Sequence, residues 1–237
     1  MFTHFNYLLL TIMAIPLSTA AYERNLLWQD DLNLWDDVVI KSPEKARGYD
    51  SRGLAYYNKG QYDRAMEDYN RAIALNPNYG KTYTNRGLAY YSKGQYDRAI
   101  EDYDRAIALN PNLALAYNNR GIAYDNKGQY DRAVEDYNKA IALNPNLALA
   151  YNNRGLAYNN KGQYDRAIED FNRAITLDPN LALVYNNLGI AYANKGQYDR
   201  AVSDFQKACD SGDKNGCKNL QKALGSVDSH LKNSPSP

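Results

Sequence analysis

Residues 117–146 read YNNRGIAYDNKGQYDRAVEDYNKAIALNPN, and residues 151–180 read YNNRGLAYNNKGQYDRAIEDFNRAITLDPN, so nearly the same string recurs 34 positions later. The same spacing separates five prolines along the chain: Pro43, Pro77, Pro111, Pro145 and Pro179. Self-similarity at one fixed period is typical of a stacked array of identical supersecondary units. Counting back from each proline gives five repeats, which we number one to five: 46–79, 80–113, 114–147, 148–181 and 182–215.

Each repeat is predicted to form two helices. The first half carries a mid-helix glycine, which costs about 1 kcal/mol relative to alanine and is tolerable where a neighbouring helix approaches closely. A second glycine follows seven residues later and suits the left-handed residue that closes a helix. An aspartate then opens the second helix, where its charge meets the helix dipole, and the proline ends that helix. In repeat three these positions hold Gly121, Gly128, Asp131 and Pro145.

The pattern resembles the tetratricopeptide repeat over about residues 46–224. In repeat two the family positions hold Tyr83, Gly87, Tyr90, Ala99, Tyr103, Ala106 and Pro111. The resemblance implies an all-α fold, a right-handed α-solenoid of five helix pairs with an N-terminal half-repeat and a C-terminal capping helix. One departure is an arginine where the family often has leucine, at Arg52, Arg86, Arg120 and Arg154; Leu188 restores the leucine in repeat five. We expect the arginine stems to lie on apolar surface with their heads in water.

Composition and motifs argue against catalysis and against nucleic acid. Basic and acidic side chains number 28 and 27, a net charge of +1, which creates no long-range field for an acidic partner. His4 and His230 have no nucleophile arrangement near them, and no phosphate-binding glycine loop is present. Glu101 and Asp102 recur in nearly every repeat and are interpreted as solvated surface residues. The sequence therefore predicts no enzyme, cofactor, metal, nucleic-acid partner or small-molecule substrate, and favours a scaffold for a protein or peptide partner.

The resemblance also suggests a peptide-binding groove lined by the first helices. An asparagine amide offers both a donor and an acceptor, so it can pair with a peptide backbone whatever the side chains. The repeated asparagines resemble the asparagine ladder of the O-GlcNAc transferase repeat domain, whereas the carboxylate clamp of chaperone-binding members is absent. Two tyrosines fall on the same face and would favour the N-terminal repeats. The predicted peptide-binding residues are Asn85, Asn119, Asn153, Asn187, Asn118, Asn152, Asn186, Tyr57 and Tyr91. Alternatively, the asparagines are structural and satisfy backbone groups between repeats.

The two ends of the chain differ from the array. Residues 1–21 are largely apolar, with Thr19, Ala20 and Ala21 suited to signal cleavage, and are predicted to be a signal peptide or a membrane anchor. An apolar helix packed on the array is the alternative. Residues 22–47 resemble the juxtamembrane link of membrane tetratricopeptide proteins, and residues 22–45 are assigned to this link and to a half-repeat whose helix ends at Pro43. Residues 225–237 are polar and are predicted to lack fixed structure.

The two cysteines lie at the end of the array. Aligning the last repeats places Cys209 and Cys217 at packing positions on adjacent helices, so their sulfurs should face each other. The spacing also resembles that of Sel-one-like repeats, which bridge such pairs. The pair is predicted to form a disulfide between repeat five and a helix over about 216–224; two buried thiols are the alternative.

Two functions remain open from the sequence. The first is a scaffold that binds extended peptide segments in the groove, exported to or anchored in the cell envelope rather than cytoplasmic. The second is a structural or assembly module, through self-association or as an accessory subunit of a membrane glycosyltransferase-type system.

Overall fold

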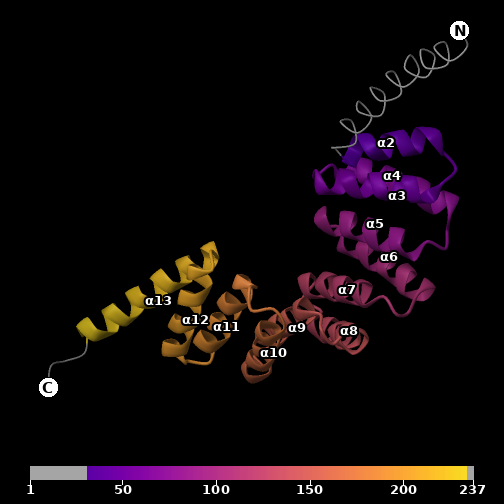
Figure 1. Ribbon diagram of the computed structural model, residues 1–237. Helices are drawn as coiled ribbons and strands as arrows, with labels where there is room; N and C mark the ends of the chain where they lie inside the picture. The colour runs from indigo at the N-terminus through magenta and orange to yellow at the C-terminus, as the bar shows by residue number, and fades with distance from the viewer. Residues whose placement is uncertain (1–30, 234–237) are drawn as a thin grey trace, which may run out of the picture. The chain divides into compact units, whose positions relative to one another are not determined.

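The computed structural model describes residues 31–233, and every regular element in that range is an α-helix (Figure 1). The predicted leader 1–21 and residues 22–30 of the predicted link lie outside it. No helix within the described range is long and apolar enough to span a membrane. The chain divides at residues 95 and 96 into two compact parts, which are described separately. Each consists of stacked antiparallel helices, as expected for an all-α solenoid.

The N-terminal part holds four described helices: α2 (Asp31–Lys41), α3 (Ala46–Asn58), α4 (Tyr62–Leu75) and α5 (Gly80–Ser92). Helix α2 ends two residues before Pro43 and packs against α3. Their backbones are close at Gly48, where a Cβ atom would lie 3.3 Å from Cγ2 of the buried Val39. The helix before repeat one therefore covers the apolar face of α3.

The C-terminal part continues the alternation of first and second helices with α6 (Tyr96–Leu109), α7 (Ala114–Asn126), α8 (Tyr130–Leu143), α9 (Ala148–Asn160), α10 (Tyr164–Leu177), α11 (Ala182–Asn194), α12 (Tyr198–Asp210) and α13 (Lys214–Asn233). Each helix packs against the next one along the chain. Helices α6, α8 and α10 each end two residues before the repeated proline, as predicted.

The repeated glycines have the two roles that the sequence predicts. At Gly121 an added Cβ would lie 2.6 Å from Cε1 of the buried Tyr137 ring, so the second helix can pack closely only on glycine. Gly128 has a φ of 71° and closes α7 in the left-handed conformation. Small residues on one helix and an aromatic ring on the next thus form the core of each pair.

The prediction that the repeated arginines hold their heads in water is wrong. The guanidinium of Arg120 binds both carboxylate oxygens of Asp136, at 2.6 and 2.8 Å, and its side chain is only 19% exposed. The carboxylate hydrogen bond raises the pKa of Arg120 further above its usual value. Asp102, interpreted as a surface residue, is also buried. The aspartate recurs because the repeated arginine needs a buried carboxylate as its hydrogen-bond acceptor, and not because the position is solvated.

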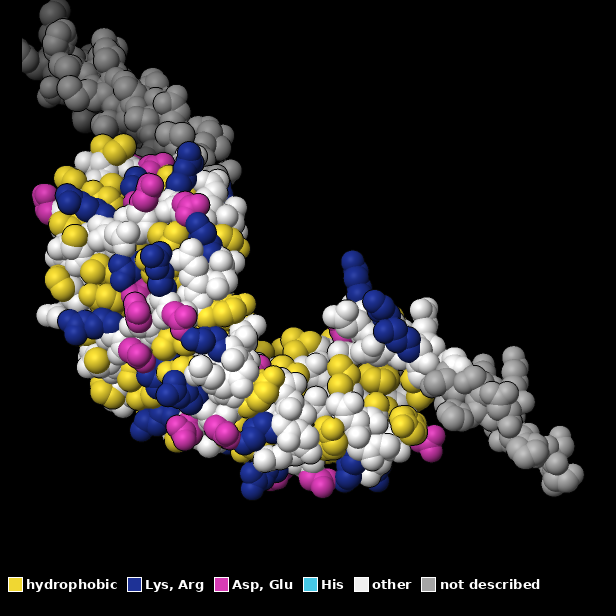
Figure 2. All heavy atoms as spheres, turned by 180° about the vertical axis from the view of Figure 1, so that it is seen from behind, with side chains coloured by type: hydrophobic (Ala, Val, Ile, Leu, Met, Phe, Trp, Pro, Cys, Tyr) yellow, Lys and Arg dark blue, Asp and Glu magenta, His cyan; other side chains and the backbone are white. Residues whose placement is uncertain are grey.

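Surface charges elsewhere are mixed, with basic and acidic side chains interspersed (Figure 2). Several are paired between consecutive repeats, as Lys127 is with Asp97 and Lys161 with Asp131. Figure 2 also shows a row of basic side chains at the C-terminal helix, where Lys214, Lys218 and Lys222 are all exposed. Apart from this row, the face in Figure 2 carries both signs of charge throughout.

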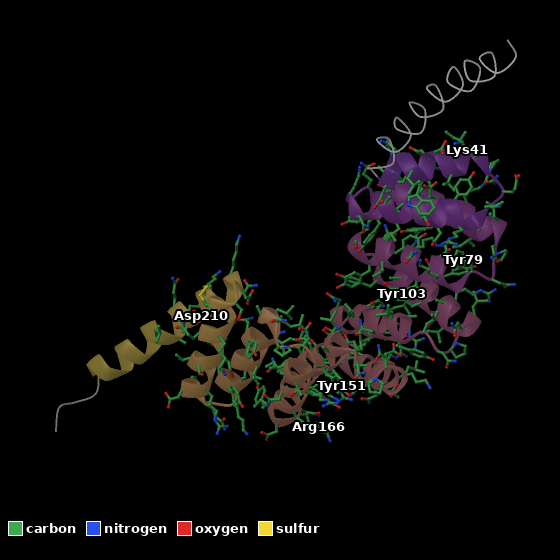
Figure 3. All side chains as sticks on the ribbon, in the orientation of Figure 1. Lys41, Tyr79, Tyr103, Tyr151, Arg166 and Asp210 are labelled. Carbon is green, nitrogen blue, oxygen red and sulfur yellow. A yellow bond between two sulfur atoms is a disulfide. The ribbon has the colours of Figure 1, made fainter. Side chains whose placement is uncertain are left out.

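The end of the array is tied by a disulfide between Cys209 of α12 and Cys217 of α13, with Cα atoms 4.4 Å apart (Figure 3). Helix α13 is longer than predicted, because it continues to Asn233 through the segment expected to lack fixed structure. The prediction placed its end next to Gly225. An isolated glycine costs a helix only about 1 kcal/mol and does not by itself end one.

Candidate peptide-binding face

The first helices of the C-terminal part form one continuous surface. Helix α7 contacts α9, α9 contacts α11, and α11 contacts α13, in addition to the second helix that lies between each pair in the chain. We call the surface formed by α7, α9, α11 and α13 the first-helix face. Successive repeats contact each other in the same way, so equivalent positions of the first helices line up in rows across this face. Residues four apart on one helix share a side, so two such rows lie beside each other.

An inner row of asparagines lies between the repeats. Asn118, Asn152 and Asn186 are only 5%, 3% and 7% exposed. Each accepts a hydrogen bond from the next repeat: Asn118 from Asn153 at 3.0 Å, Asn152 from Asn187 at 2.9 Å, and Asn186 from Asn219 at 2.8 Å. Buried amides need such partners, because an unpaired one costs about 1–3 kcal/mol. This row therefore ties neighbouring repeats together.

An outer row of asparagines is more accessible. Asn119, Asn153 and Asn187 are partly exposed, and Asn153 both donates to Asn118 and accepts from Asn152 at 3.1 Å. An amide carries two N–H donors and two acceptor positions, so Asn153 keeps one of each for a ligand while its orientation is fixed.

In the N-terminal part, Asn85 is buried and donates to Asp50 at 3.0 Å. It thus occupies the outer-row position of its repeat without the exposure of Asn119 and Asn153. The outer row available to a ligand is therefore that of the C-terminal part.

A row of exposed leucines accompanies the outer asparagines and was missed from the sequence. Leu115, Leu149 and Leu183 are 59%, 45% and 42% exposed, and each lies one helical turn before its asparagine. The repeated strings LALAYNN and LALVYNN carry this signal. Asn219 of α13 was also missed. It occupies the outer-row position after repeat five. It follows Asn187 by two residues fewer than the period of the repeats, since the connection before α13 is two residues shorter.

The two predicted tyrosines lie in the N-terminal part. The Tyr57 hydroxyl is 3.1 Å from Oγ of Ser92, and its ring centroid is 5.4 Å from that of Tyr62. Tyr91 lies on α5 and is partly exposed. Asp125 replaces them in repeat three, where burial raises the pKa of its carboxyl group and a hydrogen bond from Asn160 partly opposes that rise. This position is therefore aromatic in repeats one and two and holds Asp125, Asn159 and Ala193 in repeats three to five.

The chemistry of the first-helix face is that of a binding surface. Partly exposed amides and exposed aliphatic side chains offer hydrogen bonds and apolar contact, and these rows contain no nucleophile paired with a general base. Helix pairs of 34 residues, joined by glycine and proline turns and stacked through such rows, define a helical repeat protein that acts as an interaction scaffold.

Comparison with known families agrees. Family models described as "TPR repeat" match residues 53–94 and 87–128, and models described as "Tetratricopeptide repeat" match 114–147, 148–181 and 171–203. The chain therefore belongs to the tetratricopeptide repeat family. No curated protein matches it by sequence. The likeness of the cysteine pair to Sel-one-like repeats and that of residues 22–47 to a juxtamembrane link remain predictions.

Solved structures show the same fold. The structure of MamA is 33% identical in sequence, and the match covers 68% of this chain and 95% of MamA with a TM-score of 0.61. Residues 41 to the end of MamA from Desulfovibrio magneticus RS-1 are 25% identical, with coverage of 70% and 94% and a TM-score of 0.63. YrrB, titled a TPR protein with an unusual peptide-binding site, is 22% identical, with coverage of 82% and 97% and a TM-score of 0.61. The last likeness concerns the fold alone.

Proposed function

We propose that this protein is a scaffold that binds an extended segment of a partner protein along the first-helix face of its C-terminal part. The observation that carries the proposal is the pair of parallel rows on that face, exposed Leu115, Leu149 and Leu183 beside Asn119, Asn153 and Asn187. The asparagine amides would hold the main chain of the segment, and the leucines would contact its apolar side chains.

The inner asparagines support this role indirectly. Because Asn118 and Asn152 fix the amides of the next repeat, the outer row loses little side-chain freedom when a ligand binds, which favours affinity. Each outer amide would add about 0.5–1.5 kcal/mol net, so single substitutions should be mild and combined ones severe. Tyr57 and Tyr91 remain predicted peptide-binding residues of the N-terminal part.

The test begins with a display selection of random 12-residue peptides on the purified chain. The best peptide is then measured by fluorescence anisotropy against two triple variants. Leu115→Ser, Leu149→Ser and Leu183→Ser removes the exposed row without opening the core and should weaken binding at least tenfold.

The matched control, Glu101→Gln, Glu135→Gln and Glu169→Gln, changes exposed positions on the second helices and should leave binding unchanged. Loss of binding in the control alone would place the site on the second helices and refute the proposal. An absence of any enriched peptide would also count against it.

The outer asparagines need a variant that separates binding from folding. Asn119→Ala, Asn153→Ala and Asn187→Ala should abolish peptide binding while the helical circular dichroism signal persists. If this variant unfolds in buffer, the asparagines are structural, and the leucine triple variant alone decides the site.

Location and self-association remain predictions. Export is proposed from the leader and the cysteine pair, and a compartment reporter fused after Lys41 tests it, since full activity of a cytoplasm-only reporter would exclude export. The assembly alternative predicts that the scattering mass of the purified chain rises with concentration.

A further inference from the structure

Repeat four contains a part-buried arginine with partners on both neighbouring second helices, α8 and α10. Arg154 donates from Nε and Nη2 to the two carboxylate oxygens of Asp170, at 2.8 and 2.6 Å, and from Nη1 to Asn138 at 2.6 Å. Its guanidinium carbon lies 5.6 Å from the ring centroid of Tyr151 and 5.9 Å from that of Tyr158. A bidentate carboxylate and two aromatic rings are the contacts that a planar guanidinium prefers.

The same arrangement is present in repeats one and three. The acceptors lie 16 residues before and after the arginine, and the tyrosines three before and four after it. In repeat three Arg120 has Asp104, Tyr117, Tyr124 and Asp136, and in repeat one Arg52 has Asp36, Tyr49, Tyr56 and Asp68. In three repeats, then, the guanidinium has the same four partners: two side-chain acceptors and two tyrosine rings.

Repeat five keeps these partners and lacks the arginine. Asn172, Tyr185, Tyr192 and Asp204 stand at the four partner positions, and Leu188 replaces the arginine. Leucine is shorter than arginine, and a cavity of about 400 Å³ lined by all five residues is present there. We call this cavity the repeat-five pocket. It lies between α10, α11 and α12, away from the rows of the first-helix face.

The carboxylate in this pocket has only a partial partner. Lys207 Nζ lies 3.0 Å from Oδ1 of Asp204, and the lysine side chain is 56% exposed while the aspartate side chain is 7% exposed. An ammonium is a compact point charge and does not match a carboxylate as the planar fork of arginine does. Lys207 therefore neutralises Asp204 without filling the cavity.

We propose that the repeat-five pocket binds an arginine side chain of a partner protein. The incoming guanidinium would take the place that Arg154 holds in repeat four, paired with Asp204 and Asn172 between Tyr185 and Tyr192. Apolar lining from Leu188 and from Ile175 suits the methylene stem of such a side chain.

Two cations flank the aromatic rings of the pocket, and of these Lys207 also competes for Asp204. Arg200 lies 5.5 Å from the Tyr192 centroid, and Lys207 lies 5.8 Å from the Tyr185 centroid. Repeat four has flanking cations at the same positions, with Arg166 over Tyr158 and Arg173 over Tyr151, and still holds the guanidinium of Arg154 between the rings; Figure 3 labels Tyr151 and Arg166. In repeat four each tyrosine ring therefore contacts one outer cation as well as the guanidinium that lies between the two rings.

The first experiment titrates the full chain with Nα-acetyl-arginine amide, which mimics an arginine within a polypeptide, and follows the response by two-dimensional NMR. We expect saturable shifts at the amide of Asn172 and at the rings of Tyr185 and Tyr192. The lysine analogue and the uncharged citrulline analogue should bind at least tenfold more weakly. Equal binding of all three probes, or no saturable shift, would overturn the proposal. Tighter binding of free arginine than of the blocked probe would overturn the partner-protein source and indicate a small-molecule site.

Variants link the response to the pocket. Leu188→Arg should fill it from within, abolish the response and raise the melting temperature, whereas the control Leu188→Met should keep the response. Asp204→Asn should weaken binding at least tenfold, and Lys207→Gln, which removes the competing cation, should strengthen it severalfold. A folded Leu188→Arg chain that still binds the probe would refute the site. If Leu188→Arg does not fold, the other two variants decide. An affinity for the probe that is unchanged in both Lys207→Gln and Asp204→Asn would then refute the site.

Discussion

The buried ion pair of repeat four should contribute far more to stability than the exposed ion pair on the same helix. The Asp170 side chain is 6% exposed and shares two hydrogen bonds with Arg154, whose side chain is 20% exposed. Asp165, also on α10, is 82% exposed and pairs with Lys195, which is 35% exposed. Substituting each aspartate by asparagine removes one negative charge in both cases, so the two variants form a matched pair.

The expected magnitudes follow from burial. Breaking a fully buried pair costs about 3–5 kcal/mol, and Arg154 keeps some solvent contact and its bond to Asn138. We therefore expect Asp170→Asn to lower the free energy of unfolding by about 2–4 kcal/mol. An exposed pair contributes about 0–1 kcal/mol, so Asp165→Asn should change stability by less than about 1 kcal/mol. The Asp170 carboxylate raises the pKa of Arg154, and the arginine stays charged across the usable pH range. Burial raises the pKa of the Asp170 carboxyl group, and the hydrogen bond from Arg154 opposes that rise; the lower end of the expected range allows for this desolvation.

Urea unfolding followed by circular dichroism at pH 7 measures both values, with an unchanged m value as the condition for comparing them. The reasoning fails if Asp170→Asn costs less than about 1 kcal/mol, or if Asp165→Asn costs as much as Asp170→Asn. The first result would mean that the buried carboxylate loses as much by desolvation as it gains from the guanidinium, and the second that burial does not set the strength of these ion pairs.

Three further outcomes are expected. The buried hydroxyl of Tyr69 has no hydrogen-bond partner among the described residues, so Tyr69→Phe, the residue that Phe171 supplies in repeat four, should raise the free energy of unfolding by about 1 kcal/mol. Because burial raises the folded-state pKa of Asp125, its proton-linked stability is present below the unfolded pKa of about 3.9 and is lost as the pH rises through the folded pKa. Asp125→Asn should therefore stabilise the chain at pH 7 and flatten its stability profile above about pH 4. Reducing the Cys209–Cys217 disulfide should remove about 2–3 kcal/mol on the chain-entropy model and accelerate hydrogen exchange in α13 before the other helices.

The sequence predicted the helix pairs well because their determinants are local and repeated. A close-approach glycine, a left-handed glycine and a terminating proline each act within a few residues, and Gly121 and Gly128 have the predicted roles. The resemblance to a known family then supplied the way in which the pairs stack.

The arginine partners could not be predicted in the same way. Arg120 and Asp136 are 16 residues apart on different helices, and no helical period connects them. Repetition alone also did not show whether Asp102 is solvated or buried, because a duplicated module repeats its core as faithfully as its surface. The inner asparagines were placed on the correct helices, but their pairing depends on contacts between repeats. Asn219 was missed, although the alignment that placed Cys217 on the last helix also puts Asn219 at the position equivalent to Asn187.

The bonds between asparagines have a consequence for the length of the array. Asn153 meets Asn118 just as Asn187 meets Asn152, and Lys161 meets Asp131 as Lys195 meets Asp165. These asparagine and lysine–aspartate pairs on the two sides of repeat four are therefore interchangeable, whereas Arg154 contacts Asn138 on one side and Leu188 stands beside Asn172 on the other. Removing residues 148–181 would bring Asn187 against Asn118 and Lys195 against Asp131, with the same chemical pairs re-formed. Unequal recombination within such a gene can add or delete whole repeats while the asparagine and lysine–aspartate pairs at the new junction re-form.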